Sequence, residues 1–207
     1  MTELAATAEP PGADARRTRA AASAGDRLPG EEGTWVLIFG DLVVFAFVFG
    51  AYLAQRLGHR SVFLVGQQLL DRNLAFGNTL LLLTGSVLVV RGLRAVRAGR
   101  PDRSSWCFAG ALACGLGFVA VKVVEYHHLV STGHGPSSST FFTYYFVLTG
   151  LHLFHVVVGL AALTFLVVAS RRPTTPRRRA YLESAACFWH LVDLLWIVLF
   201  PLLYLLR

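Results

Sequence analysis

Residues 143–170 read TYYFVLTGLHLFHVVVGLAALTFLVVAS, a mostly apolar run that contains no Asp, Glu, Lys or Arg. A helix that spans a bilayer takes roughly 20 apolar residues, so this run is long enough to cross a membrane. His152 and His155 nevertheless lie near its middle. Because a polar group in hydrocarbon needs a partner, the rest of the chain must supply partners for these two imidazole rings.

The composition of the whole chain favours a membrane protein. Of its 207 residues, 55% are hydrophobic and 15% are charged, and the mean hydropathy is +0.55. A soluble domain has about 25% charged residues to cover a wet surface, a need that a bilayer removes. The net charge of +7 does not indicate a nucleic-acid partner, because the arginines concentrate between apolar runs, which is typical of membrane topology signals.

Five apolar segments predict an all-α, polytopic membrane bundle of five transmembrane helices. Helices are expected because a backbone in lipid must satisfy its own hydrogen bonds, and the segments are too long and too uniformly apolar for barrel strands. Residues 1–33 lack the apolar core of a secretory signal, and we expect them to form a disordered cytoplasmic tail. Residues 34–207 form the predicted transmembrane domain, with spans at about 35–57, 74–96, 105–130, 140–169 and 182–206.

The arginines predict how the helices are oriented. If the loops alternate between the two sides, fourteen arginines lie on the side of the N-terminal tail and four lie on the other side. The fourteen are Arg16, Arg17, Arg19, Arg27, Arg91, Arg94, Arg97, Arg100, Arg103, Arg171, Arg172, Arg177, Arg178 and Arg179. Because cytoplasmic loops carry the excess of basic residues, the N-terminus is predicted to be cytoplasmic and the C-terminus outside.

Ionisable residues inside the predicted spans are candidates for function, because they are costly there. They are Asp41, Lys122, Glu125, His152, His155, His190 and Asp193. Close contacts between the helices are predicted by small residues, namely Gly40, Gly50, Gly110, Gly115, Gly117, Gly150 and Gly159.

The acidic and basic candidates allow two interpretations. Lys122 and Glu125 lie three residues apart on one helix face, where an ion pair would make both tolerable in the bilayer. Asp41 has no cation nearby in sequence, and without one its carboxyl favours the neutral form, which would exchange protons with the cytoplasm. A hydrogen bond from Asp41 to a facing helix or a lipid headgroup is an equal alternative. A transporter-like protein would use Asp41, Lys122 and Glu125 for flux.

The histidines also allow two interpretations. His152 and His155 share a helix face, and His190 and Asp193 repeat that spacing on the next helix, beside Trp189. These residues predict an interhelical polar cluster that binds no metal. The alternative is a small haem-binding membrane cytochrome, with His155 and His190 as axial ligands. The three cysteines form no CxxC pair, so we predict no thiolate metal site.

Five motifs, in order along residues 33–207, resemble helices of the cytochrome c oxidase subunit III family. FVLTGLHLFHVVVG is similar to the family's sixth-helix signature, and FWHLVDLLWIVLFPLLYLL is similar to its last helix, with Trp189, His190, Asp193 and Trp196 in register. LGFVAVKVVEY resembles its Glu-Tyr helix, WVLIFGDLVVFAFVFGAYL its carboxylate helix and FGNTLLLLTG its Asn-Thr helix.

The chain departs from the usual pattern of this family. The first two of seven helices are absent, as in shorter bacterial members. Asp41 stands where Glu is usual, Lys122 where Gln is common and Leu153 where Gly is frequent. These departures resemble the branch of the family that is associated with nitric oxide reductases.

The resemblance implies a non-catalytic subunit of a haem-copper respiratory complex, either an oxidase or a nitric oxide reductase, in the bacterial plasma membrane. Such a subunit carries no haem or copper itself; those cofactors belong to the catalytic subunit I, its partner together with subunit II. It binds phospholipid and supports assembly, proton uptake and sustained turnover in aerobic electron transport. The resemblance makes Asp41 the residue most tied to proton supply or lipid contact. Three histidines in the spans are too few for a haem-copper active site.

Overall fold

The structure is a computed structural model that describes residues 32–172 and 175–206. The predicted tail therefore lies, up to residue 31, outside the described residues. The described elements are α2 (Glu32–Gly58), α3 (Arg60–Gln68), α4 (Arg72–Arg97), α5 (Pro101–Ser131), α6 (Thr140–Ser170), α7 (Pro176–Phe200) and the short π-helix η1 (Pro201–Leu205).

Five helices in the described part of the chain are long and apolar enough to cross a membrane, which confirms the predicted all-α fold of five spans. The spans are Trp35–Gly58, Arg72–Arg97, Pro101–Ser131, Thr140–Ser170 and Pro176–Leu205. Several helices extend beyond the apolar runs, because the polar residues at their ends continue the same hydrogen-bond ladder. The chain is thus a multi-pass membrane protein.

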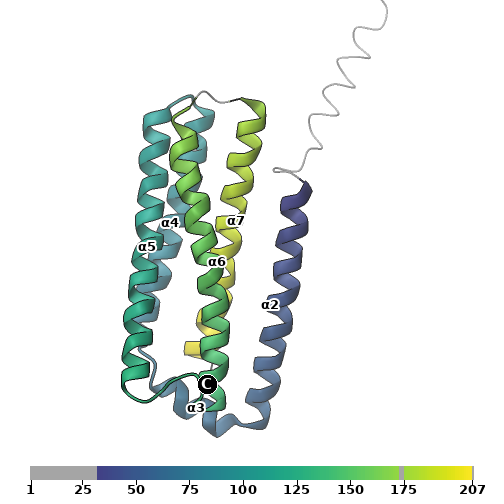
Figure 1. Ribbon diagram of the computed structural model, residues 1–207, viewed down its shortest axis with the longest axis vertical. Coiled ribbons are helices and arrows are strands. Elements are labelled where there is room, and N and C mark those ends of the chain that lie inside the picture. Colours follow the sequence, from purple (N-terminus) through teal and green to yellow (C-terminus); the bar gives the residue numbers. More distant parts are fainter. Residues whose placement is uncertain (1–31, 173–174, 207) are drawn as a thin grey trace, which may run out of the picture.

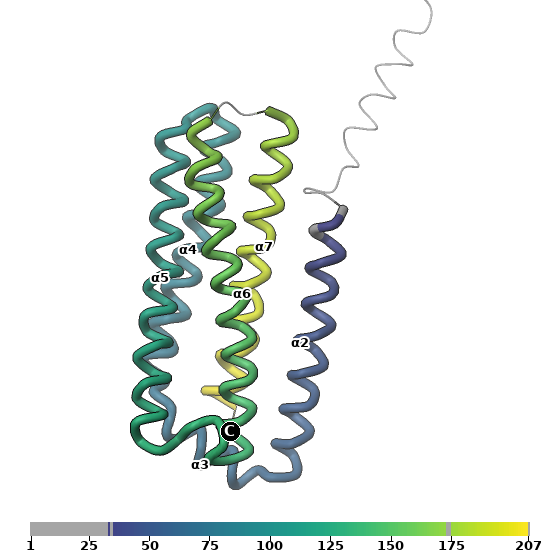
Figure 2. The backbone as a smooth tube through the Cα atoms, in the orientation of Figure 1, coloured from purple at the N-terminus to yellow at the C-terminus, as the bar shows by residue number. Residues whose placement is uncertain are grey.

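Helices α4 to α7 form a four-helix bundle in which each helix packs on the next and α7 packs back on α4 (Figure 1). Helix α2 lies to the side of this bundle, next to α7 (Figure 2). The start of α2 and the α4–α5 and α6–α7 connections lie at one end of the molecule, which we call the arginine-rich end. The opposite end holds α3, the α5–α6 connection and the C-terminus (Figure 1).

The ends of the long helices follow from local sequence. Asp71 caps α4 by accepting hydrogen bonds from the backbone N–H groups of Asn73 and Leu74, at 2.9 and 3.2 Å. After α4 and α5, Gly99 (φ 68°) and Gly133 (φ 83°) adopt the left-handed conformation that glycine tolerates best and so stop the helices. Short connections result, which hold neighbouring helices antiparallel.

The helices of the bundle pack closely around the indole ring of Trp189. The Trp189 side chain of α7 is fully buried, and Gly85, Gly115 and Gly159 of three other helices approach it. A Cβ atom at Gly115 would lie 2.8 Å from Trp189 Cη2, and one at Gly159 would lie 3.0 Å from Trp189 Cε3. Small residues therefore permit the close helix contacts that were predicted at these two positions.

The prediction of close contacts is wrong at Gly40, Gly50 and Gly150. A Cβ atom at any of the three would meet no described atom within 4 Å. Two of these glycines belong to α2, which explains the difference: α2 stands beside the bundle rather than within it (Figure 2).

The short helix α3 was not predicted and joins α2 to the bundle. Its Phe63 ring packs edge-on against Tyr52 of α2, with ring centroids 5.3 Å apart, and against Phe141 of α6, at 5.7 Å. Two hydrogen bonds add to this attachment. The Tyr52 hydroxyl donates to the Leu202 carbonyl at 3.3 Å, and Arg56 Nη2 donates to the Leu206 carbonyl at 2.7 Å. Polar and aromatic contacts thus hold the half of α2 that lies away from the arginine-rich end.

Candidate functional site

The first polar centre is a pair between α2 and α6. His155 Nε2 lies 3.4 Å from Asp41 Oδ1. Asp41 lies six residues into the span that begins at Trp35, about 9 Å along the helix axis at 1.5 Å per residue. The Phe45 ring packs against the His155 ring with centroids 5.3 Å apart. A facing helix therefore supplies the partner that Asp41 lacks in its own sequence neighbourhood.

The second ring nitrogen of His155 constrains the proton content of this pair. His155 Nδ1 lies 2.8 Å from the Leu151 carbonyl oxygen, and a carbonyl oxygen only accepts hydrogen bonds. The proton on Nδ1 is therefore committed to Leu151. A favourable contact between Nε2 and Asp41 then requires one further proton, on either the carboxyl group or the ring. The contact between α2 and α6 therefore joins a carboxyl group to a ring nitrogen whose partner nitrogen is already bonded to Leu151.

The second polar centre, the Lys122 cluster, comprises Lys122, Glu125, Tyr145, Tyr204 and Trp196. Lys122 Nζ donates to Glu125 Oε2 at 2.8 Å, which confirms the ion pair predicted from their spacing, and to the Tyr204 hydroxyl at 2.9 Å. The Tyr204 hydroxyl donates to Glu125 Oε1 at 2.7 Å. The ammonium group also lies 4.8 Å from the centre of the Trp196 ring. Both charges are therefore partnered, and the cluster ties η1 and α7 to α5.

The partners of the Lys122 cluster could not be predicted from charge alone. Tyr145 and Tyr204 belong to α6 and η1, and their hydroxyl groups lie 3.3 Å apart. Neither tyrosine is charged at neutral pH, so a search for acidic residues, basic residues and histidines does not find them. The signal that would have found them is the presence of a phenol in an apolar span, where it requires a hydrogen-bond partner.

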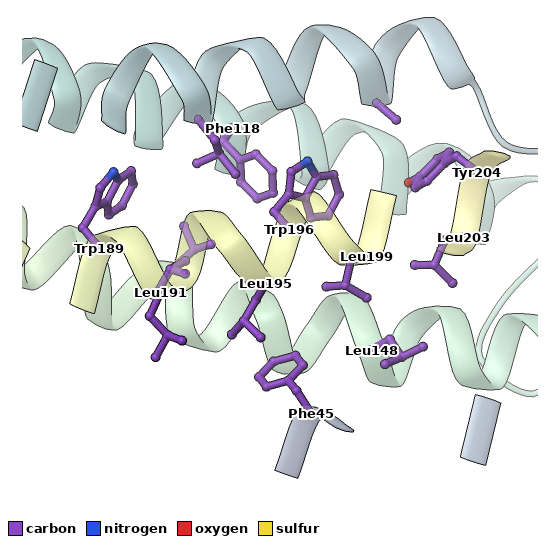
Figure 3. Close-up of a cluster of buried hydrophobic side chains, with 14 of the residues drawn as sticks. Phe45, Phe118, Leu148, Trp189, Leu191, Leu195, Trp196, Leu199, Leu203 and Tyr204 are labelled. Atoms are coloured by element: carbon purple, nitrogen blue, oxygen red, sulfur yellow. The ribbon is translucent and has the colours of Figure 1, made fainter. Parts of the chain in front are cut away.

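His152 is completely buried and contacts the Lys122 cluster through the ring of Trp196. Its ring lies between aromatic rings of two neighbouring helices, with centroids 5.6 Å from Phe118 and 5.1 Å from Trp196. Phe118 and Trp196 themselves lie side by side in the core (Figure 3). Neither ring nitrogen of His152 has a hydrogen-bond partner among the described protein atoms. This histidine packs as an aromatic side chain.

His190 faces α4 rather than α6. Its Nδ1 atom lies 2.8 Å from the Ser86 hydroxyl. Six residues further along α7, the Trp196 indole donates to the Thr79 hydroxyl of α4 at 3.0 Å. Thr79 and Ser86 lie seven residues apart, so they share one face of α4, a pattern visible in the sequence. The α4–α7 contact is thus lined by hydroxyl groups, which were not among the predicted site residues.

The structure distributes the predicted interhelical cluster over separate contacts. His155 pairs with α2, His152 packs inside the bundle, and His190 pairs with α4, while Asp193 Oδ1 and Trp189 Nε1 have no partner among the described atoms. Both ring nitrogens of His155 already have partners, Leu151 and Asp41. Helix α2, which carries Asp41, lies on the side of α7 away from α4, the helix that His190 faces (Figure 1). This geometry does not support the haem-binding alternative.

No group of three or more His, Cys, Asp or Glu side chains in the described ranges could hold a metal ion. Lys122 and Glu125 neutralise each other, and Asp41 pairs with a different helix. The fold and the polar centres together define a polytopic membrane protein in which these ionisable side chains make contacts within and between helices.

This chain belongs to the cytochrome c oxidase subunit III family. The family model described as "Cytochrome c oxidase subunit III" matches residues 31–206, which is nearly the whole described structure. The family resemblance seen in the sequence motifs is therefore confirmed.

Curated relatives support the same assignment. The chain is 29% identical over 175 residues to the cytochrome bo(3) ubiquinol oxidase subunit 3 of Pseudomonas putida, covering 84% of each protein. It is 31% identical over 177 residues to the probable cytochrome c oxidase subunit 3 of Nocardia farcinica, covering 84% of this chain and 87% of that one. It is also 30% identical to a heme-copper oxidase subunit I+III of Aeropyrum pernix, over 83% of this chain and 22% of the fused protein.

Proposed function

We propose that this chain is the non-catalytic subunit III of a haem-copper respiratory complex in a bacterial plasma membrane. The observation that carries the proposal is the family match over residues 31–206, which includes all five spans. The Aeropyrum pernix relative, in which subunits I and III share one chain, favours direct packing of this subunit on a catalytic subunit I. Haem and copper would belong to that partner, and phospholipid would bind in a cleft between the helices of this chain.

We further propose that the arginine-rich end faces the cytoplasm. The arginine-rich connections between α4 and α5 and between α6 and α7 support this orientation, because cytoplasmic loops carry the excess of basic residues. Arg56, Arg60 and Arg72 belong to the opposite end. In this orientation Asp41 lies about 9 Å from the cytoplasmic end of its span, within reach of protons from that side.

The Asp41–His155 pair would support proton uptake by the complex. With its one further proton bound, on the carboxyl group or on the ring, the pair would hold no unpaired charge. Release of the proton would leave the Asp41 carboxylate charged, and a further proton from the cytoplasmic side would neutralise it. Asp41 is the more accessible member, with 23% of its side chain exposed against 11% for His155. Lys122 and Glu125 would instead hold the helices together.

Purification of a tagged copy tests the proposed function. In mild detergent we expect the chain to migrate on a native gel with a large subunit that carries haem. The identity of that subunit assigns the complex as an oxidase or as a nitric oxide reductase. The departures at Asp41, Lys122 and Leu153 resemble the branch of the family that is associated with nitric oxide reductases. A chain that migrates alone would contradict the proposal. So would a Soret band from the isolated chain that disappears when His155 or His190 is replaced.

A further inference from the structure

Residues 201–206, which we call the η1 segment, follow α7 and contain the π-helix η1. Pro201 has no backbone N–H group, so the regular hydrogen-bond ladder of α7 cannot continue through it. The Leu206 N–H group donates to the Pro201 carbonyl at 2.9 Å, a bond between residues five apart. Such π turns are rare and occur frequently at functional sites. The position of the η1 segment therefore depends on contacts outside the regular ladder.

One side of the η1 segment is fixed by the Lys122 cluster. The Tyr204 hydroxyl accepts a hydrogen bond from Lys122 Nζ at 2.9 Å and donates one to Glu125 Oε1 at 2.7 Å, in a fully enclosed position. Hydrogen bonds to charged groups of this kind are roughly twice as strong as those between neutral groups. Because the backbone of the segment sets where the Tyr204 ring can lie, these two bonds hold that backbone against α5.

The other side of the η1 segment holds α2. Tyr52 and Arg56 lie four residues apart on one face of α2, and both side chains are buried. They donate to the carbonyl oxygens of Leu202 and Leu206, at 3.3 and 2.7 Å. Both acceptors are backbone atoms of the η1 segment, so a shift of that backbone would break both bonds together. A buried guanidinium group that lost its acceptor would then favour movement of α2 away from the bundle.

We propose that the η1 segment is a conformational relay through which the Lys122 cluster holds residues 52–58 of α2 on the bundle. Coupling between two sites requires an element with two arrangements that both sites bias, and the η1 segment is that element. While Tyr204 is bonded in the cluster, the two carbonyl groups lie within reach of α2. When Tyr204 leaves the cluster, the segment shifts and residues 52–58 are released.

The relay gives the enclosed charge pair of the bundle control over the helix that carries Asp41. It is formed by this chain alone, so it does not depend on which catalytic subunit is the partner. Tyr204 acts in it as a positioning residue, because it contacts α2 only through the backbone of its own segment. A merely structural tyrosine would loosen its immediate surroundings, whereas the relay predicts an effect on a helix that Tyr204 does not bond.

Hydrogen–deuterium exchange of the full chain in detergent micelles tests the proposal. The test variant is Tyr204→Phe, which keeps the ring and removes its hydroxyl. The matched control is Tyr126→Phe, which removes a phenol hydroxyl that donates to Thr149 of α6 at 2.6 Å. We expect residues 52–58 to exchange about tenfold faster in Tyr204→Phe than in wild type, close to the worth of one hydrogen bond to a charged group. In Tyr126→Phe these residues should exchange at the wild-type rate.

A double variant shows whether Tyr204 acts through the η1 segment. In Tyr52→Phe one of the two bonds between α2 and the segment is already absent. Adding Tyr204→Phe to this background should therefore accelerate exchange of residues 52–58 by a smaller factor than it does in wild type. If the two accelerations simply multiply, the two hydroxyl groups act on α2 independently, and the relay is wrong.

Unchanged exchange of residues 52–58 in Tyr204→Phe would overturn the proposal, and so would equal acceleration in Tyr126→Phe, which would indicate general loosening of the bundle. Should Tyr204→Phe fail to fold, Tyr52→Phe tests the relay in the opposite direction. Because coupling between two sites is reciprocal, we expect faster exchange of the Leu206 N–H group, which donates to Pro201 within the segment. Wild-type exchange at Leu206 in that variant would contradict the relay.

Discussion

The helices of the α4–α7 bundle are held to one another by buried packing, whereas α2 is held to the bundle by a few separate contacts. In the most apolar part of each span, 50% of α7 is buried within the chain but only 11% of α2. The bundle interlocks around Trp189 and the Lys122 cluster, whereas α2 is held by Phe45, two hydrogen bonds at its outer half and the Asp41–His155 pair.

This contrast assigns different roles to the two regions: the bundle provides the stability of the fold, and the boundary with α2 is where we propose that a proton is exchanged. The paired charges of the bundle are enclosed, and the Lys122 side chain is only 2% exposed. The Asp41 carboxyl lies between α2 and the bundle with 23% of its side chain exposed, and there we propose that it exchanges protons. The comparison therefore predicts that substitutions in the bundle change the free energy of unfolding most, and that a substitution of Asp41 changes it least.

The largest effect on stability is expected from removing one charge of the Lys122 cluster. Glu125→Leu leaves the Lys122 ammonium buried without its carboxylate, which should cost about 3 to 5 kcal/mol. Unfolding in mixed detergent micelles, followed by helical circular dichroism, measures the change. The K122M/E125L double variant removes both charges and should recover most of the loss. Equal stability of Glu125→Leu and wild type would show that the ion pair does not hold the bundle.

A smaller effect is expected from crowding Trp189. In Gly115→Ala the new methyl group would lie 2.7 Å from Leu160 Cδ2 and 2.8 Å from Trp189 Cη2. Overpacking of this kind should destabilise the bundle by about 1 to 3 kcal/mol. Gly150→Ala is the matched control, because nothing lies within 4 Å of its Cβ position. We expect the control to be neutral or stabilising, since alanine favours helix. If Gly115→Ala and Gly150→Ala have the same free energy of unfolding, close packing around Trp189 does not stabilise the bundle.

Removing one contact that holds α2 should have a small effect on stability, confined to α2 and the segment it contacts. Tyr52→Phe removes the hydrogen bond to the Leu202 carbonyl, a loss of about 0.6 kcal/mol for a typical contact between membrane helices. Hydrogen exchange should speed up in α2 and η1 and stay unchanged in α4 and α5. Tyr181→Phe, at an exposed position of α7, is the control and should change neither. Uniform acceleration across the bundle would mean that α2 is not a separate unit.

The five spans could be predicted because each is a long apolar run, and the Lys122–Glu125 pair because residues three apart on a helix must be neighbours. The Asp41–His155 pair could not be predicted in this way, since it depends on how α2 and α6 are rotated toward each other. The prediction that His155 and Asp193 belong to one polar cluster assumed that α6 and α7, which are adjacent in sequence, turn their polar faces toward each other.

The short helix α3 was missed because its polar and apolar residues are mixed. Only its inner face, with Phe63, Gly66 and Gln67 at helical spacing, is buried. Tyr204 was missed because a phenol carries no charge, although it accepts from Lys122 and donates to Glu125. In both cases the deciding information is the position of a neighbouring helix.

The most direct test of the account is how long the assembled complex stays active when Asp41 is replaced. In Asp41→Asn the complex should assemble with unchanged stability, because His155 keeps its hydrogen bond to Leu151, but it should inactivate after fewer turnovers than wild type. Asp41→Glu should retain wild-type persistence, and Asp102→Asn, which removes an exposed carboxylate near the same end, should have no effect. If Asp41→Asn sustains turnover as long as wild type, the Asp41–His155 pair does not supply protons.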